Sequence, residues 1–511
     1  MSVPRTLVRD SFIVSLAGVL FVAGTLGRAH QKLFWHDEIF TAVMAALPRD
    51  DVWAALREGL DLSPPGFHLL TRISHAIFGS GLLGTRMPAL IGVFLAAVCA
   101  GVFVRRRYGA PAGLCAMLLL LCGDAYLYAY EARPYGPVLG FAGAAIVCWQ
   151  SAVSAVQRRA WLAGLFASLA AALACHYYAV LLFIPIGLAE LARFLRTRQP
   201  DWPLWLSVCG SLLPLILFLP LIASVGQYSA GHFAPPRLRT VLNSYESTAS
   251  ELAVPFLLTL LAAGTLAFRS GRREDARDRS GTAHEGVLAA ALTLLPVFAF
   301  ALAWGWTNAL EPRYYLPWTL GLSILVPFTI AELSPYGQRI LVTLASVLFL
   351  WFGARQALSA RWLAHESPEL RSMYPRLFEP ANGTWPIVIA NPHVYLVATY
   401  YAEPALQRRL ITLTRPGEAS TPAGAMDTSS RSFRAMAKRF PLQLEDFDAF
   451  TARHSTFLVY GPPSNWVLAS LRARGAVLVL RGEDADTQLF PMSRPAPSYF
   501  LFEVRLPHAP G

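Results

Sequence analysis

Long apolar runs separated by short polar segments occupy residues 1–359 of the chain. A transmembrane helix needs roughly 20 mostly apolar residues, because lipid offers no hydrogen-bond partners for free backbone groups. About eleven runs meet this requirement and predict a polytopic α-helical membrane protein. The predicted spans are Ser11–Gly27, Met87–Val104, Ala112–Tyr128, Tyr135–Val156, Trp161–Cys175, Tyr177–Phe194, Leu204–Val225, Thr248–Phe268, Val287–Trp304, Tyr315–Glu332 and Ile340–Gln356.

The segment between the first two spans is too polar to cross a bilayer but has a regular pattern. Glu38–Ala46, Asp51–Glu58 and Phe67–Phe78 each have helical spacing with one apolar face. Such a pattern is typical of helices that lie in the membrane interface. Phe67–Phe78 contains Arg72 and His75, so it is not counted as a span.

The region from residue 360 to residue 511 has mixed charge, many prolines and short apolar runs between turn residues. These features predict a separate soluble α/β domain that follows a transmembrane domain of residues 1–359. The segment Pro416–Ser432 has the composition of a loop. Strands are predicted at Pro386–Ala390, Thr456–Tyr460, Ala476–Leu480 and Tyr499–Val504, and helices at Val394–Arg409 and Trp466–Arg474.

Composition supports a membrane location, because 55% of the 511 residues are hydrophobic and only 15% are charged. The net charge of +11 comes almost wholly from arginines between the apolar runs, which indicates membrane topology and no nucleic-acid partner. No disulfide framework or thiolate zinc site is implied, because all six cysteines fall in apolar segments.

The arginines also predict the orientation of the spans, because loops rich in Arg and Lys stay in the cytoplasm. If the spans alternate, the basic loops all fall on one side, and an odd number of spans sends the C-terminal domain to the other. We therefore expect a multi-pass protein of the bacterial inner membrane, with its first run as an uncleaved signal anchor and its active site and C-terminal domain periplasmic. The basic groups are Arg5 and Arg9, Arg105–Arg107, Arg158 and Arg159, Arg193 with Arg196 and Arg198, and Arg269–Arg279.

The most distinctive polar feature is an adjacent carboxylate pair, Asp37 and Glu38, just outside the first span. Charged groups near a bilayer are costly and usually functional. Sugar transfer needs a carboxylate that accepts the proton of the attacking hydroxyl, which makes Asp37 the candidate base and Glu38 a positioning or second carboxylate. The alternative is structural: Asp37 could cap the N-terminus of a helix.

The short outer turn between the third and fourth spans contains Glu131, Arg133 and Tyr135. A guanidinium group can bind phosphate oxygens through two parallel hydrogen bonds, which makes Arg133 a candidate ligand of a lipid-linked phosphate. The structural alternative is a belt of interfacial tyrosines with Glu131 paired to Arg133.

Two further outer loops contain candidate residues. Arg313 and Tyr314 precede the tenth span, where Arg313 could be a second phosphate cation or an ordinary headgroup anchor. His176 lies between the fifth and sixth spans, where a lone histidine is more often structural than catalytic. Asp124 is either an intramembrane functional acid or a carboxylate near a helix end.

Taken in order, several of these segments resemble the GT-C superfamily of membrane glycosyltransferases. They are Asp37-Glu38, Pro64-Pro65-Gly66-Phe67-His68, Gly84-Thr85-Arg86-Met87-Pro88, Glu131-Ala132-Arg133-Pro134-Tyr135 and Arg313-Tyr314-Tyr315. The pattern is most similar to glycosyltransferase family 39, the dolichyl-phosphate-mannose protein mannosyltransferases, and to the bacterial aminoarabinose lipid A transferases.

The resemblance implies an inverting transfer of a sugar from a polyprenyl-phosphate carrier to a lipid, glycan or protein acceptor. It implies Asp37 as the base, and Arg133 and Arg313 as contacts of the carrier phosphate. A divalent metal held by Asp37 and Glu38 stays open, because no other ligand signature accompanies them. The alternatives are a secondary transporter or lipid flippase, and a membrane-anchored assembly protein.

Overall fold

The computed structural model describes residues 5–154, 157–226, 234–269, 283–334, 336–365, 374–379, 383–415, 428–484 and 498–507. The chain divides into two compact units, each with its own hydrophobic core. The first unit contains residues 1–30 and 63–364, and the second contains residues 31–62 and 365–511. Residues 31–62 were assigned from sequence to the transmembrane domain, but their contacts lie within the C-terminal unit.

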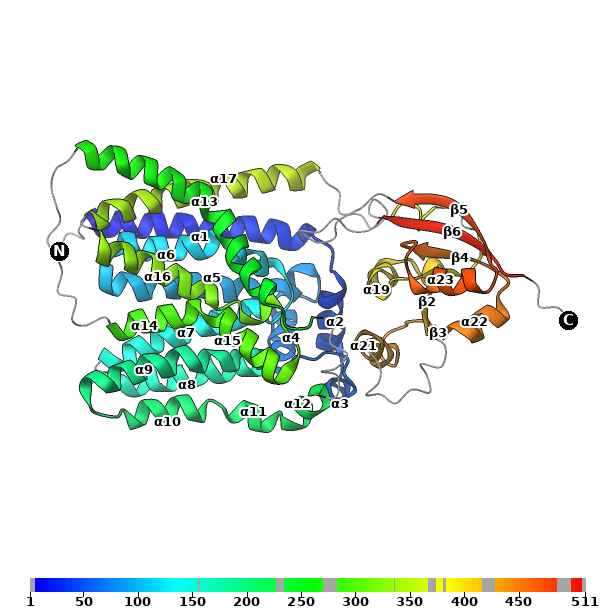
Figure 1. Cartoon of the computed structure of the whole chain (residues 1–511), viewed down its shortest axis with the longest axis horizontal. Coiled ribbons are helices and arrows are strands. Elements are labelled where there is room, and N and C mark those ends of the chain that lie inside the picture. The colour runs from blue at the N-terminus through cyan, green and yellow to red at the C-terminus, as the bar shows by residue number, and fades with distance from the viewer. Residues whose placement is uncertain are drawn as a thin grey trace. The chain divides into compact units, whose positions relative to one another are not determined.

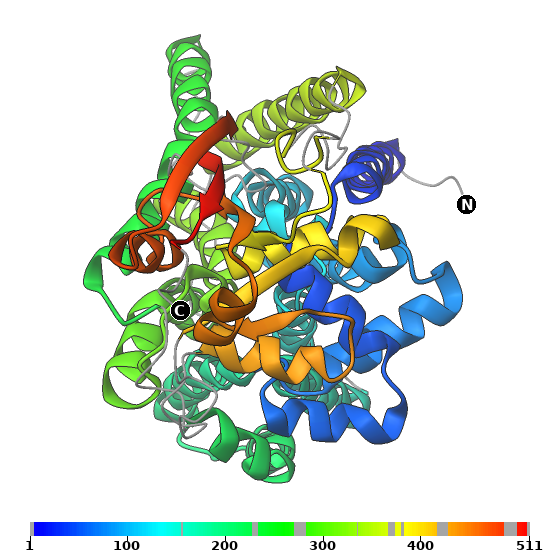
Figure 2. The ribbon, with the colours of Figure 1, turned by 90° about the vertical axis from the view of Figure 1, so that its right-hand side faces the viewer.

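The first unit is a bundle of apolar helices, most of which run parallel or antiparallel to one another (Figure 1). Figure 2 views many of these helices nearly end-on. The described residues of each predicted span are mostly helical. The helices are α1 Arg5–Gln31, α4 Gly66–Phe78, α5 Leu82–Tyr108, α6 Ala110–Cys122, α7 Tyr135–Ser154, α8 Arg158–Cys175, α9 Phe183–Thr197, α10 Trp202–Gly210, α11 Leu213–Leu217, α12 Leu219–Gly226, α13 Leu238–Arg269, α14 Ala283–Thr293, α15 Leu295–Leu302, α16 Trp318–Leu333 and α17 Gly337–His365.

Several predicted spans are broken, which the apolar pattern did not indicate. Among the described residues, five helices are long and apolar enough to cross a membrane, or up to eight if each bent pair is one span. The chain bends by 66° after α6, by 61° between α11 and α12, and by 52° between α14 and α15. The protein is a polytopic membrane protein, and the number of eleven spans stays a prediction.

Glycines allow α5 and α7 to pack closely together. A Cβ atom added to Gly140 would lie 2.6 Å from the carbonyl oxygen of Gly92, and one added to Gly92 would lie 2.3 Å from that of Gly136. Distances this short require the two helix backbones to separate. Small residues thus permit the close approach that drives helix association in lipid, where no hydrophobic effect operates.

We expect Gly140→Ala to lower the stability of the bundle by about 1–3 kcal/mol, the usual cost of overpacking. Resistance of the purified protein to unfolding in denaturing detergent measures this effect. Gly187→Ala is the matched control, because a Cβ atom at Gly187 in α9 meets no other atom within 4 Å. Equal stability of the two variants would show that the α5–α7 contact is looser than the structure has it.

Buried ion pairs link the ends of several helices of the first unit. The guanidinium of Arg107 at the end of α5 donates to both carboxylate oxygens of Glu285 in α14, at 2.7 and 2.9 Å, and Glu285 is 1% exposed. Arg193 of α9 pairs with Glu190 at 2.7 Å and with Asp201 at 2.6 Å. The predicted cytoplasmic arginines of these loops are therefore partly bound in ion pairs that fix neighbouring helices.

The second unit contains a six-stranded sheet in the order β3-β2-β1-β4-β6-β5. The strands β3, β2, β1 and β4 are parallel, while β6 runs antiparallel to both β4 and β5. The central strands are continuous buried apolar runs, as is typical of a parallel sheet covered on both faces. The strands are β1 Ile387–Ile389, β2 Leu410–Thr414, β3 Leu444–Asp446, β4 Thr456–Gly461, β5 Val477–Asp484 and β6 Tyr499–Arg505.

The sheet confirms the predicted α/β character of the C-terminal region and corrects several details. The helix predicted at Val394–Arg409 ends at Tyr401, because Pro404 starts a separate short turn of helix and β2 follows at Leu410. In the predicted loop Pro416–Ser432, residues 416–427 lie outside the described residues, and a helix begins at Thr428. The helices of this unit are α2 His36–Ala46, α3 Arg49–Glu58, α19 Pro392–Tyr401, α20 Pro404–Gln407, α21 Thr428–Ala437, α22 Phe447–Arg453 and α23 Trp466–Ala473.

Candidate functional site

The two candidate catalytic carboxylates begin helix α2 in the second unit. The N-cap of α2 is Trp35, so Asp37 is the second residue of the helix and not its cap. Glu38 instead stabilises the helix start, because its carboxylate accepts a hydrogen bond from the backbone N–H of Trp35 at 3.3 Å. The structural alternative considered for Asp37 therefore applies to Glu38.

The environments of the two carboxylates differ. Glu38 is fully buried, whereas the side chain of Asp37 is 18% exposed and reaches solvent. Asp37 Oδ1 lies 3.3 Å from Nε2 of His36. Both acids lie in the first turn of α2, where the helix dipole stabilises negative charge. Asp37 is thus the accessible carboxylate of the pair.

In the first unit, the chain reverses direction between α6 and α7 through irregular structure. After Gly123 it forms a 3-10 helix, Asp124–Tyr130, and a tight turn at Glu131 in which the N–H of Arg133 donates to the Glu131 carbonyl at 2.8 Å. Tyr135 then begins α7. Arg133 is only 9% exposed, so the turn places a guanidinium group close to the packed end of the bundle.

Three turns from different parts of the chain meet through aromatic rings. The ring of Tyr314 lies 5.1 Å from that of His176, 6.4 Å from that of Tyr135 and 5.0 Å from that of Tyr178. The Arg313 guanidinium lies 5.9 Å from the centre of the Tyr135 ring. We call Tyr135, His176, Tyr178, Arg313 and Tyr314 the aromatic cluster. It brings together four residues that the sequence analysis selected from three separate loops.

His176 also has a clear structural role. Its Nδ1 atom accepts a hydrogen bond from the N–H of Tyr178 at 3.3 Å and caps the 3-10 helix Tyr177–Leu182. The Tyr178 hydroxyl in turn donates to the carbonyl oxygen of Ala309, just before Arg313. These bonds hold the His176 ring against Tyr314.

Sequence reasoning missed Arg28, a further cation at this end of the bundle. Its guanidinium lies 4.9 Å from the ring centre of Tyr126 and 5.4 Å from that of Tyr130, next to the Glu131 turn. Arg28 directly follows the first predicted span, where an interfacial arginine is ordinary. Only the three-dimensional contact with Tyr130 distinguishes it from other arginines.

Asp124 accepts hydrogen bonds from hydroxyl groups at the break after α6. Its two carboxylate oxygens accept hydrogen bonds from Thr248 at 2.8 Å and from Ser247 at 3.2 Å, both in α13. Of the two alternatives considered for Asp124, the structure supports a carboxylate at a helix end. The bonds fix the 3-10 helix that leads to Glu131.

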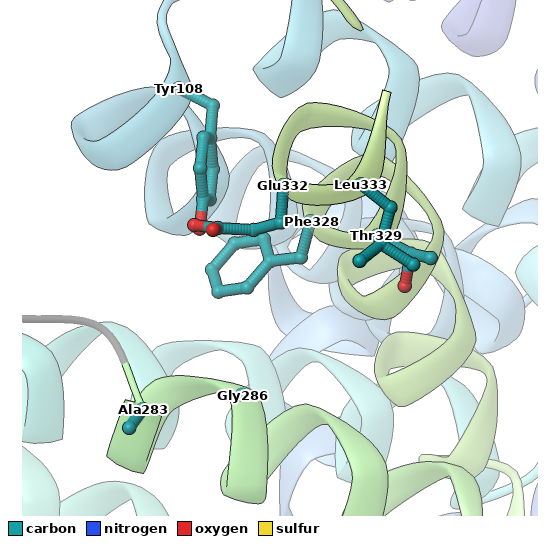
Figure 3. A pocket seen from close by; sticks show the side chains of 7 residues that line it. All are labelled: Tyr108, Ala283, Gly286, Phe328, Thr329, Glu332 and Leu333. Atoms are coloured by element: carbon teal, nitrogen blue, oxygen red, sulfur yellow. The ribbon is translucent and has the colours of Figure 1, made fainter. Parts of the chain in front are cut away.

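A separate cavity of about 350 Å³ lies at the far end of α16 from Tyr314 (Figure 3). Tyr108 and Glu332 face each other in it and are hydrogen-bonded. None of the described residues that line it is an arginine or lysine, so it is poorly suited to a phosphate. The lining residues are Tyr108, Ala283, Gly286, Phe328, Thr329, Glu332 and Leu333.

The described residues contain no group of three or more His, Cys, Asp and Glu side chains that could hold a metal ion. Asp37 and Glu38 therefore have no third such ligand in that part of the chain.

Comparison with known proteins identifies the architecture. The family model described as dolichyl-phosphate-mannose-protein mannosyltransferase matches residues 63–223, and no curated protein matches the sequence. The crystal structure of ArnT from Cupriavidus metallidurans bound to undecaprenyl phosphate superimposes with a TM-score of 0.57 at 14% identity, covering 96% of this chain and 97% of that chain. The chain shares the fold of this ArnT structure.

The apo crystal structure of the same ArnT superimposes with a TM-score of 0.58, again at 14% identity and with the same coverage of both chains. The resemblance to GT-C membrane glycosyltransferases that the sequence motifs indicated is thereby confirmed. The likeness covers nearly the whole of both chains, so the shared fold includes the C-terminal sheet domain as well as the helical bundle.

Proposed function

We propose that this protein is an inverting glycosyltransferase that moves a sugar from a polyprenyl-phosphate carrier to a lipid, glycan or protein acceptor. The observation that carries the proposal is the aromatic cluster, which joins the turn of Arg133 to the loop of Arg313 in a GT-C fold. Cations from these two loops would suit a phosphate that becomes a leaving group.

Asp37 is the general base in this proposal. Its carboxylate takes the proton of the acceptor hydroxyl while the hydroxyl oxygen forms a bond to the anomeric carbon. The bond from that carbon to the carrier phosphate breaks on the opposite face, which inverts the anomeric centre. Asp37 suits this task better than Glu38, because Glu38 is fully buried and bonded to the backbone of Trp35.

Arg133 and Arg313 bind the carrier phosphate and stabilise its growing negative charge as polyprenyl phosphate leaves. Tyr135 lies against the Arg313 guanidinium, and Tyr135 and Tyr314 offer aromatic surface at the membrane interface. His176 keeps Tyr314 in place. Glu131 fixes the turn of Arg133 through its carbonyl oxygen.

The site faces the periplasm of a bacterial inner membrane in this proposal. The arginine-rich ends Arg105–Arg107, Arg158–Arg159 and Arg193–Arg198 lie at the opposite ends of their helices from the turns of Tyr135 and His176. Basic loops favour the cytoplasm, which leaves the cluster on the outer side. Purified protein mixed with lipid-linked sugars from bacterial membranes should release polyprenyl phosphate, and no release would contradict the proposal.

We expect Arg313→Ala to lower the rate of polyprenyl phosphate release by roughly 10- to 100-fold, the effect of losing charge-assisted hydrogen bonds. Arg313→Lys should recover only part of the loss, because lysine keeps the charge without the planar fork. Initial rates at several donor concentrations measure the effect. Arg239→Ala is the control. The Arg239 side chain is 68% exposed and forms an ion pair with Glu246, which is also exposed. An Arg313→Ala rate equal to that of the control would contradict the role in phosphate binding.

Lipid translocation is a second candidate function. The three bent helix pairs favour it, because transporters often carry broken helices around their substrate. Under this alternative, labelled lipid-linked sugar would cross a proteoliposome membrane without release of polyprenyl phosphate. Under the transferase proposal, release occurs and the sugar becomes attached to the acceptor.

A further inference from the structure

The segment that carries Asp37 is built into the C-terminal unit of the chain. Residues 31–62 form one compact unit with residues 365–511, although more than 300 residues separate the two segments. Helix α2 contacts α19, and α3 contacts α21. The candidate base is therefore positioned by the sheet domain as well as by its own helix.

The first attachment is an ionic clamp between α3 and the end of α21. The guanidinium of Arg439 donates to both carboxylate oxygens of Asp51, at 2.7 and 2.9 Å, and to Glu58 at 2.8 Å. Arg439 lowers the pKa of Asp51 and that of Glu58 by these hydrogen bonds, so both acids are charged near neutral pH. Lys438 adds a contact of 3.2 Å to Glu58.

The clamp continues at the C-terminal end of α3, where helix carbonyls have no partner within the helix. Arg431 donates to the carbonyl oxygens of Glu58 at 2.6 Å and of Arg57 at 2.8 Å. Ser432 donates to the carbonyl oxygen of Gly59 at 2.7 Å. Such bonds fix the position of α3 along its axis as well as its side chains.

The second attachment reaches the candidate base itself. His393 lies in the first turn of α19, immediately after β1, and Asn391 caps that helix. Its ring stacks face to face on the ring of His36, with centroids 3.8 Å apart and planes only 4° apart. His36 also contacts Asp37, with 3.3 Å between His36 Nε2 and Asp37 Oδ1.

Neighbouring contacts hold the same region. The N–H of Phe34 donates to the Tyr401 hydroxyl at 2.6 Å, and Tyr401 ends α19. Phe40 of α2 packs against Phe433 of α21 with ring centroids 5.8 Å apart. The start and the middle of α2 are thus held by the C-terminal domain, next to the stacked rings of His36 and His393.

We propose that the C-terminal domain is part of the catalytic machinery, with His393 as a positioning residue that fixes His36 and through it the carboxylate of Asp37. This inference rests on the proposed function, in which Asp37 accepts the proton of the acceptor hydroxyl. A base must lie within hydrogen-bond reach of that proton, and a displacement of 1 Å can cost about 10²-fold in rate.

The test compares His393→Ala, His393→Phe and Asp37→Asn in the full-length protein, with lipid-linked sugars extracted from bacterial membranes as donor. We expect His393→Ala to lower kcat by roughly 10- to 100-fold with little change in the KM for donor, because donor binding uses other residues. His393→Phe should restore most of the rate, because a flat ring can still stack on His36. His454→Ala is the matched control: this histidine of the same domain contacts Phe450 instead.

The outcomes separate this inference from the proposed function. Full activity of Asp37→Asn would overturn the proposed function. An inactive Asp37→Asn together with a wild-type kcat for His393→Ala would overturn the positioning role alone. The same holds if His393→Phe is as slow as His393→Ala while both remain folded.

A second variant keeps the inference testable if His393→Ala does not fold. Arg439→Gln should speed amide hydrogen exchange at residues 36–58 and lower kcat, because the clamp on α3 is lost. Arg453→Gln is its control, since Arg453 pairs with Glu445 inside the sheet domain. Unchanged exchange and rate in Arg439→Gln would overturn the idea that the C-terminal domain holds the catalytic segment.

Discussion

Asp37→Asn is expected to lower the rate of sugar transfer by about 10²- to 10⁴-fold, the usual contribution of a general base. The amide keeps the size of the side chain and its place in the first turn of α2, but it cannot accept the acceptor proton. Because Glu38 is fully buried and bonded to Trp35 N–H, it cannot readily replace Asp37. Single-turnover measurement of polyprenyl phosphate release isolates the chemical step.

Asp50→Asn is the matched control for this prediction. Asp50 is another acid in the first turn of a helix, α3, and it is exposed. Its rate should stay within about twofold of wild type, since uncoupled surface changes have small effects. Wild-type transfer by Asp37→Asn would show that a different group accepts the proton.

Glu285→Ala is expected to destabilise the protein by about 3–5 kcal/mol, the cost of breaking a buried ion pair by removing one partner. Glu285 is 1% exposed and accepts three hydrogen bonds from Arg107 and one from Gln150 at 3.2 Å. Its loss leaves the Arg107 guanidinium without this partner between α5 and α14. Equilibrium unfolding of purified protein in denaturing detergent gives the difference.

A double variant and an exposed pair serve as controls. Replacing both Arg107 and Glu285 by leucine should recover much of the stability, because no uncompensated charge remains. Glu246→Ala breaks the exposed pair with Arg239 and should change stability by less than about 1 kcal/mol. Equal losses in Glu246→Ala and Glu285→Ala would show that burial does not govern these pairs.

The helical bundle could be predicted from sequence because long apolar runs have few structural alternatives in lipid. The bends within the spans could not be predicted, because the hydropathy of a segment carries no information on its backbone geometry. Gly123 follows the end of α6, Pro220 is the second residue of α12 and Pro296 is the second residue of α15, each beside a bend. Proline supplies no backbone N–H and ends a helix, whereas Pro88 is accommodated inside α5. A proline in the sequence therefore does not show by itself whether a helix breaks or continues.

The candidate residues could be selected one loop at a time, but their contacts could not be foreseen. Tyr135, His176 and Tyr314 come from three turns, and only the packed bundle shows that their rings meet. Nothing in the sequence distinguishes Tyr178, because an interfacial tyrosine carries little information. Its hydroxyl bond to the Ala309 carbonyl is what connects it to the cluster.

The sequence also placed residues 31–62 in the transmembrane domain by their position in the chain. Their partners, including His393 and Arg439, lie more than 350 residues away, so no local pattern reports the contact. Strand β2 was missed for a related reason: Leu410–Thr414 follows a predicted helix directly. This segment forms a strand because it pairs with β1, which is not adjacent to it in the sequence.

The most direct test of the central claim is photocrosslinking with a polyprenyl phosphate that carries a photoreactive group next to its phosphate. The account predicts labelling of peptides that contain Glu131–Tyr135, Arg313–Tyr314 and Trp35–Glu38, with competition by undecaprenyl phosphate and none by uncharged polyprenol. Labelling confined to the cavity around Tyr108 and Glu332, or labelling that polyprenol competes away equally well, would contradict it.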